Sequence, residues 1–106
     1  MLKYPNRIIT GNGTVVDLDQ LLYIKANNNG VIFHLQDGKW ISDWKSLNHF
    51  SNTLSDHPDF FQVHRSYIVK RNHIKKIKAN QLLLSDGSIV PIGITQKSKV
   101  HEWIQK

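Results

Sequence analysis

Cysteine is absent from the 106 residues of the sequence, and long apolar runs are absent as well. Without thiols the chain forms neither a disulfide framework nor a thiolate metal site, and it is compatible with a reducing compartment. Apolar runs such as residues 82–84 are far too short to cross a bilayer, and the N-terminal residues lack the continuous apolar stretch of a signal peptide. We therefore expect a cytoplasmic protein with no membrane segment.

Acidic residues are missing from the interval between Asp59 and Asp86. That interval holds six of the 14 Lys and Arg, and the other eight are matched by eight Asp and Glu, so it accounts for the formal net charge of +6. The six cations are Arg65, Lys70, Arg71, Lys75, Lys76 and Lys78. A basic segment in an otherwise neutral chain is typical of a protein that binds a polyanion, although a basic surface kept for solubility has the same composition.

Residue patterns that would support metal binding or catalysis are also lacking. No two of the six histidines are closer than seven residues, whereas zinc ligands usually come in tightly spaced pairs. His64 and Ser66 are the best pair for hydrolysis, but no glycine-rich nucleophile turn surrounds them. We expect no catalytic residue, no metal site, no cofactor and no enzyme activity.

Ten short runs with strand-like apolar patterns are present, separated by turn signals such as Asp37–Gly38 and Asp86–Gly87. Asp-Gly between apolar runs favours a β-hairpin, because both residues tolerate positive φ. The predicted strands are 7–10, 14–18, 21–26, 31–35, 39–42, 61–64, 66–69, 74–78, 81–85 and 88–92. The sequence predicts one mostly β domain, residues 1–106, whose strands are mainly antiparallel.

Two segments have helical spacing instead. Apolar residues recur every three or four positions from Trp44 to Leu54, which predicts a central helix from about Asp43 to Leu54, with Ser42 or Asp43 as its N-cap. The segment from Thr95 to Gln105 predicts a short C-terminal helix.

Polar residues interrupt the apolar run near the start of the acid-free segment. His64, Arg65 and Ser66 lie together there, and an Arg guanidinium matches both the O6/N7 edge of guanine and phosphate oxygens. Loops of this composition on a rigid sheet are suited to enter a DNA groove, while nearby lysines would neutralise phosphates.

Residues 64–69, His-Arg-Ser-Tyr-Ile-Val, resemble the HRSYIVN signature of the LytTR family, the DNA-binding output domain of many bacterial response regulators. Other segments on both sides of this motif also resemble the family and occur in the family's order: 22–24, 46–47, 60–61, 74–77, 84–87 and 90–92. The resemblance extends from roughly Thr14 to Val100. It implies a mostly β domain that regulates transcription by inserting loops into the major groove of duplex DNA.

The resemblance also implies which residues read bases. By position these are Asn29, with Asn28 beside it, and Arg65. A third family position, an Arg in the loop before the last helix, falls on Ile94, whose side chain has no hydrogen-bond donor. Ile94 is able to contact a thymine methyl, or the task passes to a later residue of the loop, and the sequence leaves the choice open. Those later residues are Thr95, Gln96 and Lys97.

Phosphate contacts and partners complete the expectation. We expect Lys70, Arg71, Lys75 and Lys97 to contact phosphates and His64, Ser66 and Asn72 to position the loop. Lys70 departs from the family, which commonly has Asn there. The family implies that a second copy binds beside the first on paired direct repeats, and that a receiver domain or kinase partner lies outside this chain. A basic RNA-binding or ribosome-associated domain is the alternative, which would need exposed aromatic rings to stack on unpaired bases.

Overall fold

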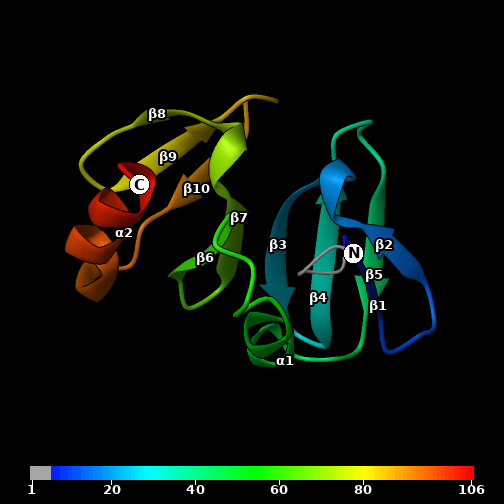
Figure 1. The fold of residues 1–106 in the computed structure, drawn as a ribbon. Helices are drawn as coiled ribbons and strands as arrows, with labels where there is room; N and C mark the ends of the chain where they lie inside the picture. The colour runs from blue at the N-terminus through cyan, green and yellow to red at the C-terminus, as the bar shows by residue number, and fades with distance from the viewer. Residues whose placement is uncertain (1–5) are drawn as a thin grey trace.

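A five-stranded antiparallel sheet forms the centre of the computed structural model, which describes residues 6–106 (Figure 1). Its strand order is β5-β4-β3-β7-β6. The bounds are β3 (Leu21–Asn27), β4 (Gly30–Leu35), β5 (Trp40–Asp43), β6 (Phe60–His64) and β7 (Tyr67–Lys70). Because β3 pairs with both β4 and β7, the early hairpin and the hairpin that contains Arg65 belong to one rigid sheet.

Smaller elements flank this sheet on two sides. A two-stranded ribbon precedes it, and a three-stranded sheet of order β10-β9-β8 follows it. The ribbon strands are β1 (Arg7–Ile9) and β2 (Val15–Asp17), and the later strands are β8 (Ile74–Ile77), β9 (Gln81–Leu84) and β10 (Ile89–Pro91). The helices are α1 (Leu47–Thr53) and α2 (Lys97–Ile104), with 3-10 turns η1 (Leu18–Gln20), η2 (Arg71–His73) and η3 (Ile94–Gln96). The predicted fold class, ten mainly antiparallel strands with two helices, is confirmed within residues 6–106.

Two hydrophobic clusters lie on opposite faces of the central strands. Ile24 and Ile68 point into the first cluster, where Phe33 meets Phe50 of α1 edge to face at 4.9 Å between ring centroids. Val69, the neighbour of Ile68, points into the second cluster with the three-stranded sheet and α2. Successive side chains of a strand alternate between faces, so β3 and β7 serve both cores at once. This double packing fixes the strands that carry the loops described below.

The central helix begins later than the sequence predicted. Strand β5 continues to Asp43, and α1 begins at Leu47 with Ser46 as its N-cap, whose Oγ accepts a hydrogen bond from the His49 backbone N–H at 3.1 Å. Ser42 and Asp43 are therefore not the cap. Asp43 is 5% exposed and its carboxylate is already hydrogen-bonded to other backbone N–H groups, so the apolar spacing from Trp44 is not helical spacing.

The C-terminal helix was predicted from Thr95, but a 3-10 turn, η3, comes first and α2 begins at Lys97. Trp103 of α2 stacks on Phe61 of β6 with 5.3 Å between ring centroids, which holds this helix on the second core.

Candidate nucleic-acid interface

Three loops that the resemblance singled out lie at one end of the molecule, the lower end in Figure 1. They are the β3–β4 turn, the β6–β7 turn and η3. The backbone N–H of Ala26 donates to the Ser66 carbonyl at 2.8 Å, which joins the first two. The N–H of Gly93 donates to the Val63 carbonyl at 2.8 Å, which joins η3 to the β6–β7 hairpin. Backbone hydrogen bonds therefore hold all three loops in one fixed relation.

Arg65 stands at the tip of the β6–β7 turn. The His64 ring accepts a hydrogen bond at Nδ1 from the Ser66 backbone N–H at 3.1 Å, which closes the turn around Arg65, and its edge contacts Tyr67. Arg65 itself is exposed, and within residues 6–106 its guanidinium has no hydrogen bond or ion pair. The turn is thus built by His64 and Ser66, and it presents an Arg whose donors all remain available to a ligand.

Asn28 and Asn29 are exposed in the β3–β4 turn, which neighbours the Arg65 turn. Asn27 Oδ1 accepts from the Asn29 backbone N–H at 3.0 Å, an Asx turn that fixes the backbone. Gly30 ends the turn with φ +148, and a Cβ on it would lie 1.9 Å from the Asp43 carbonyl oxygen. Only glycine fits there, so the two asparagines are held at a defined height above the sheet.

The third loop, η3, combines exposed and enclosed side chains. Ile94 is 88% exposed and Thr95 is exposed, whereas Gln96 Oε1 is buried and has no hydrogen-bond partner among the described residues. Between this loop and Arg65 lies an open hollow of about 600 Å³, lined by Gln62, His64, Arg65 and residues 92–96. The surface of η3 that faces outward is therefore made by Ile94 and Thr95 rather than by the Gln96 amide.

Lys70 is not a surface residue. It is 8% exposed, its ammonium donates to the Leu18 carbonyl at 2.9 Å, and it lies 5.8 Å from the centroid of the Phe60 ring. A buried charge needs such partners, and these leave the ammonium in the interior rather than at a phosphate. Lys70 therefore does not belong to the candidate interface.

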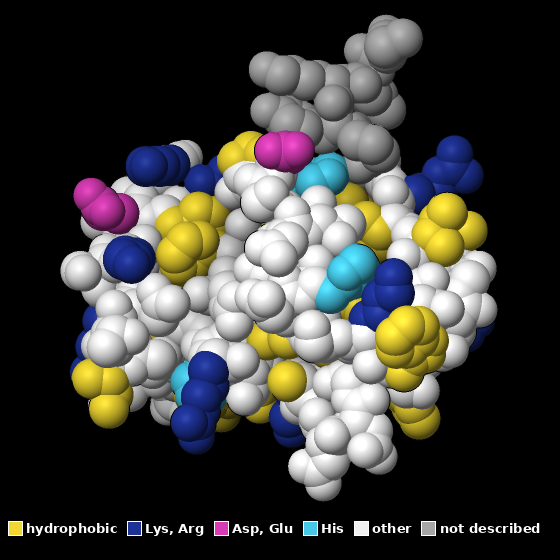
Figure 2. All heavy atoms as spheres, turned by 90° about the horizontal axis from the view of Figure 1, so that it is seen from below, with side chains coloured by type: hydrophobic (Ala, Val, Ile, Leu, Met, Phe, Trp, Pro, Cys, Tyr) yellow, Lys and Arg dark blue, Asp and Glu magenta, His cyan; other side chains and the backbone are white. Residues whose placement is uncertain are grey.

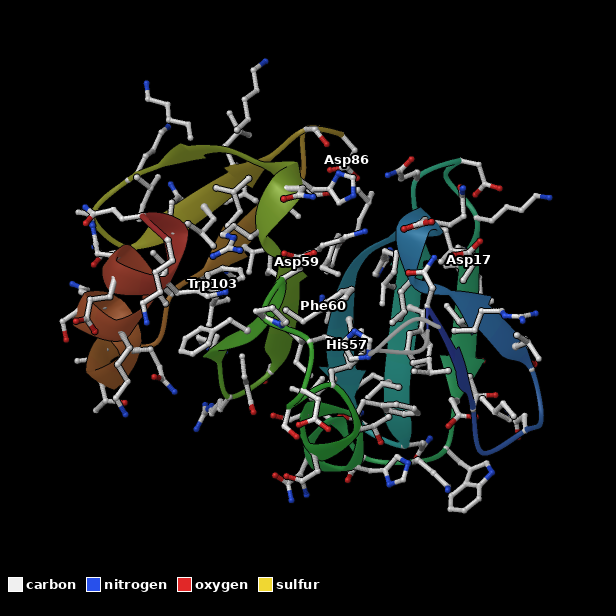
Figure 3. The ribbon with its side chains drawn as sticks, viewed as in Figure 1. Asp17, His57, Asp59, Phe60, Asp86 and Trp103 are labelled. Carbon is white, nitrogen blue, oxygen red and sulfur yellow. The ribbon has the colours of Figure 1, made fainter. Side chains whose placement is uncertain are left out.

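Arg71 also has partners inside the protein. Its guanidinium donates to the Trp103 carbonyl at 2.9 Å and to Asp59 Oδ1 at 3.3 Å, so it links η2 to the C-terminal helix. Figure 3 labels both partners, Asp59 and Trp103, which lie well above the β6–β7 turn in that view.

Asn72 and Lys75 lie beyond the other end of β7 from Arg65. The four-residue strand β7 spans roughly 10 Å from end to end, and η2 then leads into β8, at the top of Figure 1. Strand β8 is an edge of the three-stranded sheet, and a bulge between Ile74 and Lys76 leaves both Lys75 and Lys76 exposed. Lysines on an edge strand prevent it from pairing with another chain. The acid-free segment is thus not one continuous basic surface.

Lys25 is a cation at the loop end that sequence reasoning missed. It is exposed on β3, opposite Tyr67 in the register, and its ammonium lies 5.8 Å from the centroid of that ring. Nothing in the sequence signals its position, since it depends on β3 pairing with β7. Figure 2 shows the lower end with Lys and Arg side chains spread over it and acidic side chains only near its border.

The opposite end of the sheet carries two partly enclosed histidines. His34 stacks on Tyr23 with 4.4 Å between ring centroids, and His73 Nε2 is hydrogen-bonded to Gln36 Nε2 at 2.9 Å. Burial is the main cause that lowers the pKa of both, helped by Lys25 for His34 and by Lys70 for His73, while Asp86 acts in the opposite direction. Within residues 6–106, no three His, Asp or Glu side chains are grouped in a way that could hold a metal ion.

A rigid antiparallel sheet that presents three loops at an end with few acids, where the short helix α1 also lies, defines a mostly β module that would reach its ligand through loops. The chain belongs to the LytTr DNA-binding domain family, whose model matches residues 12–105. DNA binding is therefore the function of the family to which it belongs.

A solved structure has the same fold. It is the LytTr DNA-binding domain of a Bacillus cereus protein described as a putative methyl-accepting/DNA response regulator. It matches with a TM-score of 0.75 and 22% sequence identity, over 94% of this chain and 95% of that chain. Comparison with the curated proteins gives no significant match. No helix in the described part of the chain is long and apolar enough to span a membrane.

Proposed function

We propose that this chain is one domain that binds specific duplex DNA sequences as the output domain of a bacterial transcriptional regulator, with its three loops in the major groove. The observation that carries the proposal is the Arg65 turn: an exposed guanidinium without a partner among the described residues, at a turn that is hydrogen-bonded to both neighbouring loops. Loops that are fixed before binding lose little entropy on docking, which favours a specific contact.

Each loop has a chemistry suited to a base edge. Arg65 would donate two hydrogen bonds to guanine O6 and N7, and Asn28 or Asn29 would pair with adenine N6 and N7. In η3, Ile94 would contact a thymine methyl and Thr95 would add a hydroxyl. Gln96 is the weaker candidate there because its amide oxygen is enclosed.

Phosphate contacts would come from cations around the loops. Lys25 and Lys97 are the ones we propose, since both belong to segments at the loop end of the molecule. His64 and Ser66 would keep Arg65 in position. Arg71 and Lys75 would contact phosphates only where a bent duplex reaches past β7. Asn72 lies in η2, beyond the far end of β7 from the Arg65 turn that it was expected to position.

The arrangement on DNA follows from the family. We propose that two copies bind neighbouring direct repeats and that the duplex bends between them. Bending costs about 1–6 kcal/mol and is repaid by contacts at both sites. A receiver domain or a kinase partner would then control when the pair forms.

The first experiment is selection from a pool of random duplexes at about 0.15 M salt. Two similar short motifs, spaced by about one helical turn or a multiple of it, are the expected result. Uniform weak retention that disappears with added salt would overturn sequence-specific binding. Stronger retention of single-stranded RNA than of any duplex would favour the RNA-binding alternative instead.

Variants then separate the proposed roles on the selected duplex. Arg65→Ala should cost about 1–3 kcal/mol and relax one base position, whereas Lys25→Ala should weaken all duplexes alike and reduce the salt slope by about one. Lys76→Ala on β8 is the matched control, and it should change neither the affinity for DNA nor the salt slope. An equal loss on specific and random DNA from Arg65→Ala would remove Arg65 from the base readers. Lys75→Ala decides the phosphate contact predicted for that residue.

A further inference from the structure

We propose that Trp44 and Lys45 form an additional DNA contact, which covers the sugar-phosphate backbone beside the bases read by Asn28 and Asn29. The inference rests on the proposed function and extends its interface to a segment that the family resemblance does not single out. It starts from an unusual feature of the surface: Trp44 is 61% exposed although a large aromatic side chain is normally mostly buried.

Trp44 lies directly beside the β3–β4 turn. Strand β5 pairs with β4 so that Asp43 stands opposite Val31, and Trp44 follows at the end of the strand. The approach is close: a Cβ on Gly30, the last residue of the turn, would lie 2.9 Å from the Trp44 Cα. The backbone of Trp44 and the turn with the two exposed asparagines are thus neighbours at the same end of the sheet.

The segment is held in place by a buried carboxylate. Asp43 Oδ2 accepts hydrogen bonds from the backbone N–H groups of Gly11 at 3.0 Å and Lys45 at 3.2 Å, while Oδ1 accepts from Asn12 at 2.9 Å. The indole rests on Gly11, where a Cβ would lie 2.7 Å from Trp44 Cε2. An exposed aromatic side chain that is fixed in this way is ready for a ligand without further ordering.

The two side chains together match the chemistry of the DNA backbone. The Lys45 ammonium lies 5.6 Å from the centroid of the Trp44 ring. A flat apolar ring next to a cation suits a deoxyribose and its adjoining phosphate, which are the groups that position a protein on duplex DNA. A duplex seated on the β3–β4 turn would have its backbone at this place, because Trp44 borders that turn on the side away from Arg65.

Trp40 provides a matched control within the same strand. It is 62% exposed, almost the same as Trp44, but it lies at the other end of β5 and pairs with His34. Three residues of extended chain lie between the two tryptophans, which places their Cα atoms roughly 13 Å apart. Any general effect of removing an exposed indole should therefore appear in both variants, whereas a DNA contact should appear only at Trp44.

The experiment is a titration of the duplex recovered from the selection with Trp44→Ala, Trp40→Ala and the unchanged protein. We expect Trp44→Ala to weaken DNA binding about tenfold, because roughly 60 Å² of apolar surface would no longer be buried against the duplex. Trp40→Ala should change the affinity less than about twofold. When the duplex is shortened from one of its two ends, the difference between Trp44→Ala and the unchanged protein should disappear. Lys45→Ala should reduce the salt slope by about one.

Two further measurements exclude a folding artefact. Gly11→Ala keeps the Trp44 indole but should displace it, because the added Cβ would lie 2.7 Å from Trp44 Cε2. This substitution should therefore reproduce most of the loss of DNA affinity caused by Trp44→Ala. In a Trp40→Phe protein, where Trp44 and the buried Trp103 remain, duplex addition should quench the fluorescence, and Trp44→Phe should abolish that quenching.

The outcomes separate this inference from the proposed function. If the unchanged protein selects no sequence, both fail. If it does, and Arg65→Ala weakens it while Trp44→Ala behaves like Trp40→Ala, only the contact at Trp44 is refuted. Equal loss on both duplex lengths would also refute it, because a flanking contact must depend on the flank.

Discussion

Replacing Asp43 by Asn tests whether one buried carboxylate holds the β1–β2 turn against the end of β5. Its two oxygens accept three backbone hydrogen bonds, from Gly11, Asn12 and Lys45. In the substituted side chain one acceptor oxygen becomes an NH₂ donor, so at least one of these N–H groups loses its partner. Hydrogen bonds to charged groups contribute about 1.5–3 kcal/mol each, and we expect Asp43→Asn to lower the free energy of unfolding by about 2–3 kcal/mol at pH 7.

The pH dependence of that difference gives a second, independent readout. Burial alone would raise the pKa of Asp43, but the hydrogen bonds from the Gly11, Asn12 and Lys45 backbone and from Thr10 lower it below the ordinary 3.8. A lowered pKa means that the carboxylate stabilises the fold above about pH 4, and that this contribution is lost as the pH falls through the folded-state pKa. The gap between the unchanged protein and Asp43→Asn should therefore narrow on acidification.

Urea unfolding followed by tryptophan fluorescence at pH 7 and at successively lower pH values measures both quantities. Asp37→Asn is the matched control, because that exposed carboxylate accepts from the Lys39 backbone N–H in an ordinary turn. Asp37→Asn should lower the free energy of unfolding by less than about 1 kcal/mol. A gap that stays constant down to the acid transition, or a loss no larger than that of Asp37→Asn, would refute the assigned role of Asp43.

Three further changes follow from the same geometry. Gly30→Ala places a Cβ against a backbone carbonyl and should lower the melting temperature far more than Gly38→Ala, whose added Cβ meets nothing within 4 Å; equal shifts would contradict the close approach. Lys70→Met should leave DNA affinity and its salt slope unchanged, as measured by anisotropy, because the ammonium is buried; a slope reduced by about one would return it to the phosphate contacts. Burial is the first cause that lowers the pKa of His34, so the neutral ring stabilises the fold above about pH 6.5, and this contribution is lost as the pH falls through the folded-state pKa. The free energy of unfolding should therefore fall less between about pH 7 and pH 5 for His34→Gln than for the unchanged protein, and equal falls would contradict the lowered pKa.

The fold was predictable because its strands are short and well punctuated. Turn signals such as Asp86–Gly87 and the alternation around Ile24 place most strands within a residue or two of their observed bounds. The start of α1 was not predictable in the same way. Trp44 fits a helical period by chance, and only the tertiary hydrogen bonds of Asp43 show that the chain is still leaving a strand there.

The candidate site was predictable in part, for a physical reason. Arg65 and the Asn28–Asn29 pair lie on turns, and turns are exposed, so a sequence motif is enough to place them at the surface. The fate of a lysine on a strand depends on which strands pair and which edges stay open. Lys70 is enclosed, Lys25 lies beside the loops and Lys75 lies on an edge strand, and no local sequence feature distinguishes these three.

The three polar residues of the motif make different contacts in the structure. His64 and Ser66 are engaged in hydrogen bonds that shape the turn and tie it to β3, which leaves Arg65 as the residue with donors still available. Loss of the imidazole acceptor would loosen the turn and weaken every duplex alike, whereas loss of the guanidinium would remove the reading of one base. The other side of the proposed interface is arranged in the same way, with buried Asp43 fixing the segment and Trp44 exposed beside it. In both places a side-chain acceptor fixes backbone N–H groups, and the exposed side chain beside it is the one proposed to contact DNA.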